Sequence, residues 1–355
     1  MNGATGLTPT TRILLLLASA SVALWGMSMY ASYINSAALA VLIVLACGPL
    51  IDWLRRRKLP NWAALLITLT VAVVTLGALA VFLVYSTAQF VQLLPSYQAQ
   101  AEALVQNLST WLQSLGLNEA GSGALGSGMD QSKTLKVIAD FLGTLSGLFS
   151  SSITLLLLMT FLFVDVILYP GRLAWHAVHT SHYAERVREF TGDLRQYMVV
   201  MIILGVIVAV CNSVLFWVVG VDLPVLWGVL SGLLNFIPFI GFWFGLIAPA
   251  ILTLLEYGPW TMLVMSAFYI LINAIISNVI QPRLVVVRLN LTPFLNLISC
   301  TFWPLVLGPV GAIIGVPLTM AVYSLLLNVD PSTRWLANLM GATLPKETQE
   351  DAARS

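Results

Sequence analysis

Long stretches without charged residues alternate with short charged breaks along the chain, and this pattern predicts an all-α, polytopic membrane protein. A membrane-spanning helix needs about 20 apolar residues. Uncharged stretches of this kind predict six long spans, near residues 13–31, 34–51, 61–90, 147–168, 197–219 and 260–281. The run from 13 to 51 is too long for one helix, and its most polar part, Tyr30 to Ser36, is the expected turn.

Two more uncharged stretches, 223–255 and 289–329, are too long for one span and carry helix breakers in the middle. Irregular backbone at membrane depth survives only where protein or water satisfies its polar groups. We therefore expect two broken helical hairpins, as in a transporter core: hairpin A (223–255) entering from outside and hairpin B (289–329) entering from inside. The span before each hairpin could complete an inverted repeat, although prolines are common in membrane helices in any case.

Residues 91–145 differ in kind, because apolar residues recur at helical spacing with polar residues between them. Such a pattern predicts an amphipathic helical arm outside the membrane, with its apolar stripe packed in oligomer contacts. The arm is interrupted by a flexible Gly- and Ser-rich connection at 116–128. Its apolar stripe includes Leu104, Leu108, Trp111 and Leu115.

Composition supports the membrane class, because 59% of the residues are hydrophobic and 9% are charged. A soluble domain has about 45–50% apolar and about 25% charged residues. The net charge of +1 gives no nucleic-acid-binding surface. The expected partners are therefore the lipid bilayer, a small polar solute and further copies of the chain.

Basic residues set the orientation, since cytoplasmic loops are enriched in Lys and Arg. With Arg55 to Lys58 inside, the cytoplasmic segments hold 14 of the 16 Lys and Arg residues, all but Lys133 and Lys136. Both termini are then cytoplasmic, and Asp222 and Glu256 lie on the outer side. The cytoplasmic segments are 1–12, 52–60, 171–196, 282–289 and 330–355.

The predicted regions follow from these boundaries. They are three N-terminal spans (1–90), the outer arm (91–145), the fourth span with a cytoplasmic loop (146–196), the transport core (197–329) and a cytoplasmic tail (330–355).

Polar residues near the helix breaks are the candidate binding and gating residues. Freed backbone carbonyls and the Asn235 amide would meet at one depth beside Pro238 and Gly241, which suits a neutral polar solute. An Asn in a membrane helix can equally serve as a hydrogen bond between helices. The remaining candidates for binding or gating are Asn278, Gln281, Pro282, Arg283, Asn296, Pro304, Gly308, Pro309, Gly311 and Pro317.

Asp165 is an ionisable residue near the inner end of the fourth span. It is a candidate proton or cation relay, but an interfacial carboxylate in reach of water or a structural ion pair explains it as well. His176, His179 and His182 fan around a helix rather than stack, so no metal is expected. No HExxH, GxSxG or P-loop pattern occurs, and we expect neither an enzyme nor a cofactor.

Three motifs in the second half of the chain are distinctive: residues 235–241 (NFIPFIG), 278–283 (NVIQPR) and 308–317 (GPVGAIIGVP). They resemble the N-x-I-P-x-I-G signature, the amide–Pro–Arg element and the G-P-x-G element of the autoinducer-2 exporter family of bacterial membrane proteins. Pro49 to Leu54 followed by Pro60 is similar to the motif after the second span, and 94–97 (LPSY) resembles the quorum-signal transporter branch. The resemblance covers about residues 12–330.

This resemblance implies a bacterial inner-membrane protein, homo-oligomeric and pentameric, that exports small molecules. The leading expectation is a secondary transporter that exports a small polar signal such as autoinducer-2. A monovalent cation/proton antiporter is the alternative, and it would need a carboxylate deep in the core. A membrane scaffold without transport is disfavoured, because it has no need of unwound backbone at midplane.

Overall fold

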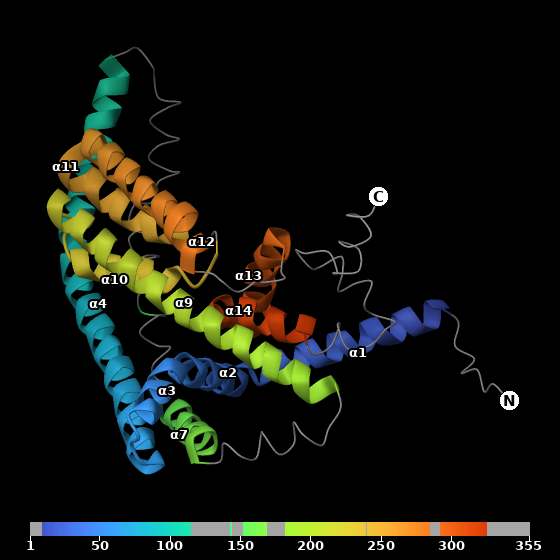
Figure 1. The fold of residues 1–355 in the computed structure, drawn as a ribbon. Helices are drawn as coiled ribbons and strands as arrows, with labels where there is room; N and C mark the ends of the chain where they lie inside the picture. Colours follow the sequence, from blue (N-terminus) through green and yellow to red (C-terminus); the bar gives the residue numbers. More distant parts are fainter. Residues whose placement is uncertain are drawn as a thin grey trace, which may run out of the picture.

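The computed structural model of the chain describes residues 9–114, 143, 152–168, 182–238, 240–284 and 292–324. Helices joined by short turns make up this described part, which confirms the all-α class (Figure 1). The C-terminal tail and most of the outer arm lie outside the described residues.

The first two helices do not form the expected hairpin. Helix α1 (Pro9–Met29) and helix α2 (Ala31–Ala46) meet end to end at Tyr30, and α1 extends away from α2 (Figure 1). The backbone N–H of Tyr30 bonds to the Gly26 carbonyl at 3.1 Å, and that of Ile34 bonds to the Tyr30 carbonyl at 3.1 Å. A reversal at Tyr30 to Ser36 is therefore wrong: this segment contains neither Gly nor Pro, so helical bonding continues.

The basic break and the long helix after it follow the predicted pattern with one difference. Helix α3 (Gly48–Arg56) ends within the basic run, Lys58 has a positive φ of 59°, and helix α4 (Asn61–Ser114) follows Pro60. The 54 residues of α4 include the predicted third span and the first part of the arm, so no break separates the two regions at residue 90.

Helices α7 (Ser152–Leu168) and α9 (His182–Val219) supply the predicted fourth and fifth spans. Helix α7 packs against α2 and α4, and α9 crosses the molecule (Figure 1). The second part of the polar loop predicted at 171–196 is continuous with α9, and it contains no proline that would end the helix before the span.

Hairpin A is present as helix α10 (Pro224–Leu234) and the first half of helix α11 (Ile240–Ile275). The chain reverses again at Gly258, whose φ of 83° and ψ of 179° interrupt α11. Tyr269 in the second half accordingly packs on Phe242 in the first, with ring centroids 5.5 Å apart. The second half, with the π-helix η1 (Ile276–Ile280) and α12 (Gln281–Leu284), matches the predicted sixth span.

Hairpin B is present as helices α13 (Pro293–Leu307) and α14 (Pro309–Val322), which pack against each other. Gly308 alone separates them, with a φ of 73°. The Thr292 hydroxyl caps α13 by accepting a bond from the Leu295 N–H at 3.3 Å. Both hairpins are therefore confirmed as paired helices, whereas the side from which hairpin B enters stays a prediction.

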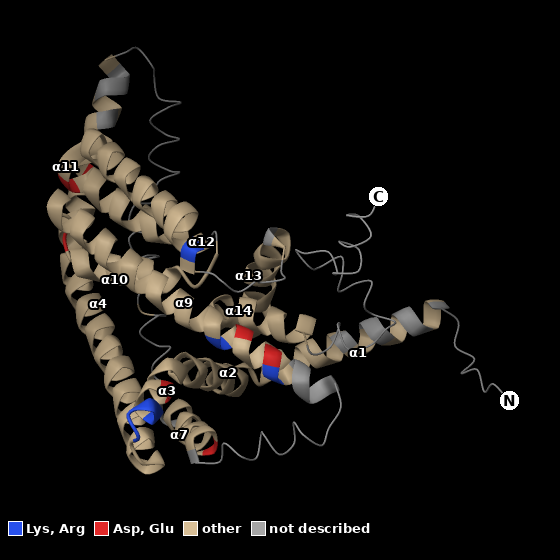
Figure 2. Cartoon of the chain, viewed as in Figure 1, with Lys and Arg blue, Asp and Glu red and all other residues tan. Residues whose placement is uncertain are grey.

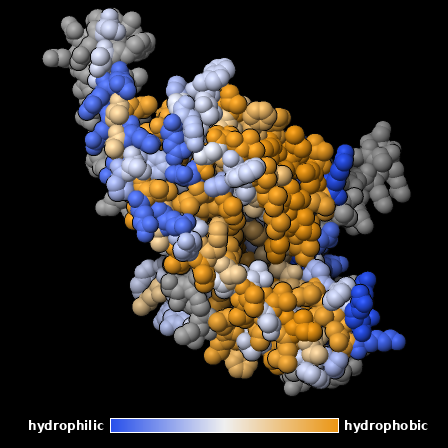
Figure 3. Space-filling view, turned by 90° about the vertical axis from the view of Figure 1, so that its left-hand side faces the viewer, coloured by the Kyte–Doolittle hydropathy of each residue, from blue (hydrophilic) through white to orange (hydrophobic). Residues whose placement is uncertain are grey.

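The described helices make this a multi-pass membrane protein. Four candidate spans are long and apolar enough to cross a bilayer: Ala31–Arg56, Asn61–Asn107, Val187–Val219 and Gly241–Leu284, the last broken at Gly258. Shorter apolar helices accompany them, so the count of six long spans stays a prediction. Apolar side chains cover most of the middle of one face, as expected of a lipid-facing surface (Figure 3).

Charged residues gather towards the ends of the long helices (Figure 2), and exposed tryptophans lie near them in sequence. Exposed Trp53 and Trp62 flank the basic run at one end, and exposed Trp217 and Trp260 flank Asp222 and Glu256 at the other. Tryptophan is enriched where a membrane protein meets the interface between lipid and water. The acidic pair therefore lies at an interface rather than in the hydrocarbon.

Candidate functional site

The tip of hairpin A is an irregular turn whose shape depends on Gly241. Helix α10 ends at Leu234, Asn235 caps it, and Gly241 donates its N–H to the Ile237 carbonyl at 3.0 Å. A Cβ on Gly241 would overlap the Leu234 carbonyl oxygen. Asn235 and Pro238, half-buried, occupy the turn between these two helices.

The tip of hairpin B is tighter, because one residue reverses the chain. Gly308 donates to the Pro304 carbonyl at 2.9 Å and accepts from the Gly311 N–H at 2.8 Å. A Cβ on Gly311 would overlap the Trp303 carbonyl. Pro304 is thus inside α13, and the break itself lies at Gly308, immediately before Pro309.

The two hairpins share one construction. One turn beyond the tip, the second leg has another glycine, and this glycine faces a buried serine on the first leg: Gly245 faces Ser231, and Gly315 faces Ser299. Ser231 bonds to the Trp227 carbonyl at 2.8 Å, and Ser299 donates to the Thr319 hydroxyl at 2.6 Å. Small residues let helix backbones approach closely in membranes, so each hairpin is a tightly closed pair.

This likeness supports the repeat for the hairpins but not for the spans before them. Helix α10 packs along α9 more extensively than any other pair of helices in the described part of the chain. Gly205 and Gly232 allow this contact, because a Cβ on either would meet the other's carbonyl oxygen. No comparable contact joins the second half of α11 to α13 among the described residues.

The two tips reach the same buried apolar cluster. Phe236 and Ile237, in the turn of hairpin A, pack against a cluster to which hairpin B contributes Trp303, Leu307 and Val310. The tips of both hairpins thus lie in one region of the protein.

A residue of another helix also bonds to hairpin B, and the sequence analysis had assigned this residue to a turn. Asn35 on α2 donates its Nδ2 to the Leu307 carbonyl at 2.8 Å, next to the break. The Asn35 Oδ1 and the Asn296 Oδ1 on α13 are buried without a partner among the described residues. The Asn35 Oδ1, beside the break, can accept a hydrogen bond from a polar solute or water, whereas Asn296 lies near the start of α13, at the other end of the helix from Gly308.

Another buried amide is that of Asn212 on α9. Its side chain is fully buried, and neither amide atom has a partner in the described part of the chain. Val208 and Phe216, one helical turn to either side, pack against Ile276 and Tyr269 of the sixth span. The amide faces the interface between α9 and that span, where it can bind a hydroxyl group.

The remaining predicted site residues lie outside the two turns, on helices. Asn278 is exposed on η1 and bonds to its own helix through the Ala274 carbonyl at 2.8 Å. Helix α12 holds the neighbouring Gln281, Pro282 and Arg283, and Pro317 is buried within α14. Asp165 is exposed three residues before the end of α7, as expected of an interfacial carboxylate.

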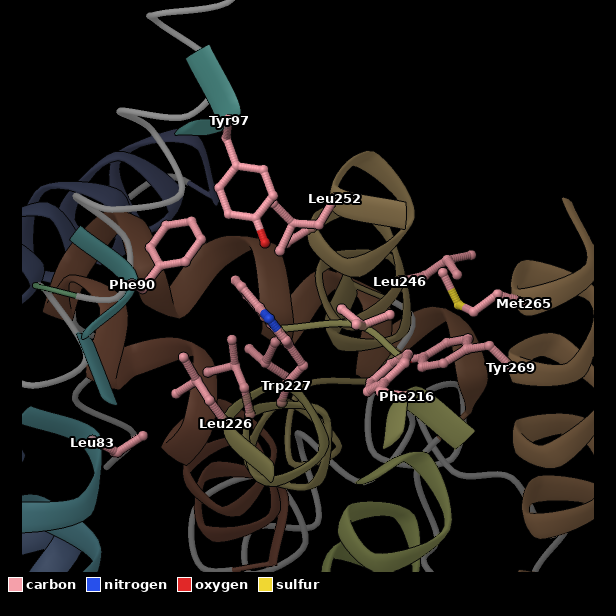
Figure 4. Close-up of a cluster of buried hydrophobic side chains, with 14 residues drawn as sticks. Leu83, Phe90, Tyr97, Phe216, Leu226, Trp227, Leu246, Leu252, Met265 and Tyr269 are labelled. Carbon is pink, nitrogen blue, oxygen red and sulfur yellow. The ribbon is translucent and has the colours of Figure 1, made fainter. Parts of the chain in front are cut away.

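The end of hairpin A opposite its tip has a polar cluster that sequence analysis did not assemble. The buried Tyr97 on α4 bonds through its hydroxyl to Asp222 Oδ2 at 3.0 Å and, at a shorter distance, to Glu256 Oε1. Tyr97 belongs to a buried aromatic and aliphatic cluster that joins α4 to hairpin A (Figure 4). The prediction that Asp222 and Glu256 lie on one side is confirmed.

At the opposite end, ionic contacts join the segments predicted to be cytoplasmic. Arg195 on α9 forms an ion pair with Asp52 on α3 at 2.6 Å. Arg55 donates to the carbonyls of Val166 and Ile167 at 3.2 and 3.0 Å and so caps the end of α7. The basic run, the end of α7 and the start of α9 therefore lie on the same side.

Similarity to known proteins agrees with this arrangement. Residues 13–330 match the family described as AI-2E family transporter. YhhT of Escherichia coli (strain K12) is 27% identical over 338 residues, covering 94% of this chain and 95% of YhhT. The AI-2 transport protein TqsA of the same organism is 26% identical over 311 residues, covering 88% of this chain and 90% of TqsA. A protein of Haemophilus influenzae is 28% identical over 337 residues, covering 93% and 96%.

A match that extends over both hairpins, their tips and the preceding spans covers every element of the candidate site, and the chain belongs to the AI-2E family of transporters.

Proposed function

We propose that the protein is a secondary transporter that exports a small, neutral, polar molecule across the bacterial inner membrane through a site between the two hairpin tips. The observation that carries this proposal is that Phe236 and Ile237 of one tip pack against the cluster formed by the other hairpin. Breaks in two hairpins free backbone polar groups at one place, and such groups bind solutes in transporter cores.

The chemistry of the tips favours a neutral solute. Neither hairpin, 223–255 or 289–329, contains a charged residue. Amides are available instead: Asn235 lies in the turn of hairpin A, and the buried Asn35 Oδ1 beside the break of hairpin B has no partner among the described residues. Such groups donate to and accept from hydroxyl and carbonyl oxygens, which suits a hydroxylated signal molecule such as autoinducer-2. TqsA, whose name states AI-2 transport, supports this choice.

Monovalent cation/proton antiport fits the same observations less well. Antiport would need a carboxylate in the core, and the hairpins have none. Asp165 lies exposed at the end of α7, away from both tips.

Transport into inverted membrane vesicles tests the proposal. Asn235→Ala should weaken solute binding about two- to tenfold, because one hydrogen bond is worth about 0.5–1.5 kcal/mol. Asn107→Ala is the matched control, since Asn107 is exposed on α4, a helix that belongs to neither hairpin. Autoinducer-2, sodium and protons are compared at equal protein levels. Sodium-driven proton movement without autoinducer-2 uptake would contradict the proposal.

A further inference from the structure

One polar cluster joins three parts of the chain: Tyr97 lies on α4, Asp222 lies just before α10, and Glu256 lies in α11. Asp222 precedes α10 by two residues, and Glu256 precedes the reversal at Gly258 by two. The two carboxylates therefore sit at the outer ends of both legs of hairpin A. A single hydroxyl from α4 contacts both of them.

These carboxylates have no basic partner on the elements that surround them. Residues 59–114 and 196–282 contain no Lys, Arg or His, and Asp222 and Glu256 are the only charged residues in the second stretch. Glu102, exposed one turn beyond Tyr97 on α4, adds another negative charge. Lys133 and Lys136, which the sequence assigns to the same side, lie outside the described residues.

The contacts need more protons than the tyrosine can supply. The phenol has one hydrogen, so it donates to one carboxylate at a time. The second oxygen–oxygen contact requires another proton, held by Glu256 or Asp222, because two ionised carboxylates around one hydroxyl repel each other. The observed arrangement therefore has one negative charge shared by the pair, not two.

We propose that Tyr97, Asp222 and Glu256 form a proton-sensitive latch that holds both legs of hairpin A against α4 while the two carboxylates share a proton. Loss of that proton leaves two negative charges in contact, and the legs separate from Tyr97. This inference goes beyond the transport function proposed above, because it assigns a control to the outer ends of hairpin A rather than to the solute site.

The direction of the pH dependence follows from the number of protons that each state holds. In the closed latch the Asp222 and Glu256 carboxylates meet at one hydroxyl and share a proton, because two ionised carboxylates at that distance repel each other. Separated, hydrated carboxylates do not need that proton. The closed state is therefore favoured at low pH and is lost as the pH rises and the shared proton leaves.

A neighbouring tyrosine provides a matched control. Tyr257, next to Glu256, donates to the Gly220 carbonyl at 2.9 Å and contacts the same loop without a carboxylate. Removing its hydroxyl deletes one hydrogen bond in the turn but leaves the proton balance of the latch unchanged. The Trp227 indole N–H, which donates to the Asp222 carbonyl at 3.1 Å, keeps the loop in place in every variant.

Spin-label distances in lipid nanodiscs test the latch directly. Labels on cysteines replacing the exposed Gln100 on α4 and Leu263 on α11, without Cys47, Cys211 and Cys300, report the separation of the two helices. From about pH 5.5 to about pH 8.5, well above the ordinary Glu pKa of about 4.3, the wild-type background should shift from a short to a longer distance.

Three variants decide the outcome. Glu256→Gln should keep the short distance at every pH, Tyr97→Phe should give the longer distance at every pH, and Tyr257→Phe should follow the wild-type profile. A wild-type distance that does not change with pH, or a Glu256→Gln variant that keeps the wild-type profile, would overturn the latch. Glu256→Gln is nearly isosteric, so this result stands even if Tyr97→Phe fails to fold. No solute is present, and failure here leaves the transport proposal to its own assay.

Discussion

Hairpins A and B are closed in the same way internally but are attached differently to the rest of the protein. In each, a glycine pair on the second leg lets the first leg approach. Hairpin A is additionally packed along α9 through Gly205 and Gly232 and bonded to Tyr97 at the end opposite its tip. The one side-chain hydrogen bond described between hairpin B and another helix is that of Asn35. Closure is thus a local property of the sequence, whereas the freedom to move depends on outside contacts.

Hairpin A is therefore attached to its neighbours by more contacts than hairpin B is. Close backbone packing with α9 means that hairpin A can move only together with α9, because packed helices shift as units. Hairpin B packs on apolar side chains and one amide, so it can shift alone at a smaller cost. Changes that act inside the hairpins should therefore affect A and B alike, and changes to their attachments should not.

The largest expected effect comes from adding a side chain to Gly241, at the tip of hairpin A. Gly241→Ala places a methyl group against the Leu234 carbonyl and should destabilise the protein by about 1–3 kcal/mol or more. Thermal unfolding in detergent, followed by tryptophan fluorescence, measures the loss. Gly77→Ala on α4 is the control, because nothing lies within 4 Å of its added Cβ. Equal melting temperatures for the two variants would show that the tip relaxes without cost.

An intermediate effect is expected where hairpin B is attached. Asn35→Ala removes the donor to the Leu307 carbonyl and leaves that group unsatisfied, at a cost of about 1–3 kcal/mol. Amide hydrogen exchange should then become faster in peptides covering 304–311 and stay unchanged in those covering 233–242. Faster exchange in both would mean that the tips are coupled, and that hairpin B does not move alone.

The smallest effect concerns the buried serines of the two hairpins. Ser299→Ala leaves Thr319 bonded to the Trp303 indole at 2.8 Å, so the loss should be about 0.6 kcal/mol, the average for hydrogen bonds in a membrane. Ser231→Ala should cost a similar amount, because its hydroxyl bonds mainly within its own helix. Unfolding by a denaturing detergent compares the two, and a difference above about 1 kcal/mol would contradict the shared construction.

The parts of the fold that depend on Gly and Pro could be predicted from the sequence. Both hairpins, their breaks and the shared side of Asp222 and Glu256 follow from breakers and from counting uncharged stretches. The predicted turn at Tyr30 to Ser36 was wrong, because it rested on polar residues alone and the segment contains no helix-breaking residue. Asn35, which made that segment polar, instead satisfies a carbonyl of hairpin B 272 residues later in the chain, a contact that no local pattern indicates.

The candidate site shows the same division. Asn235, Pro238 and Gly241 are adjacent in sequence, and their turn could be predicted. The contacts of Tyr97 could not be predicted, because they depend on α4 passing the ends of both legs of hairpin A. The available signal was the pair of carboxylates in a long stretch without a basic residue, since isolated charges near a membrane need partners.

The uninterrupted length of α4 has a mechanical consequence. At about 1.5 Å per residue, its 54 residues form a rod about 80 Å long, well over twice the thickness of the hydrocarbon layer. A tilt of about 10° about its Asn61 end displaces Ser114 by about 14 Å. Pro95, which removes one backbone hydrogen bond, lies two residues before Tyr97. The proline of α4 therefore lies next to the contact of this helix with hairpin A, and a small rotation at one end of α4 gives a large displacement at its other end.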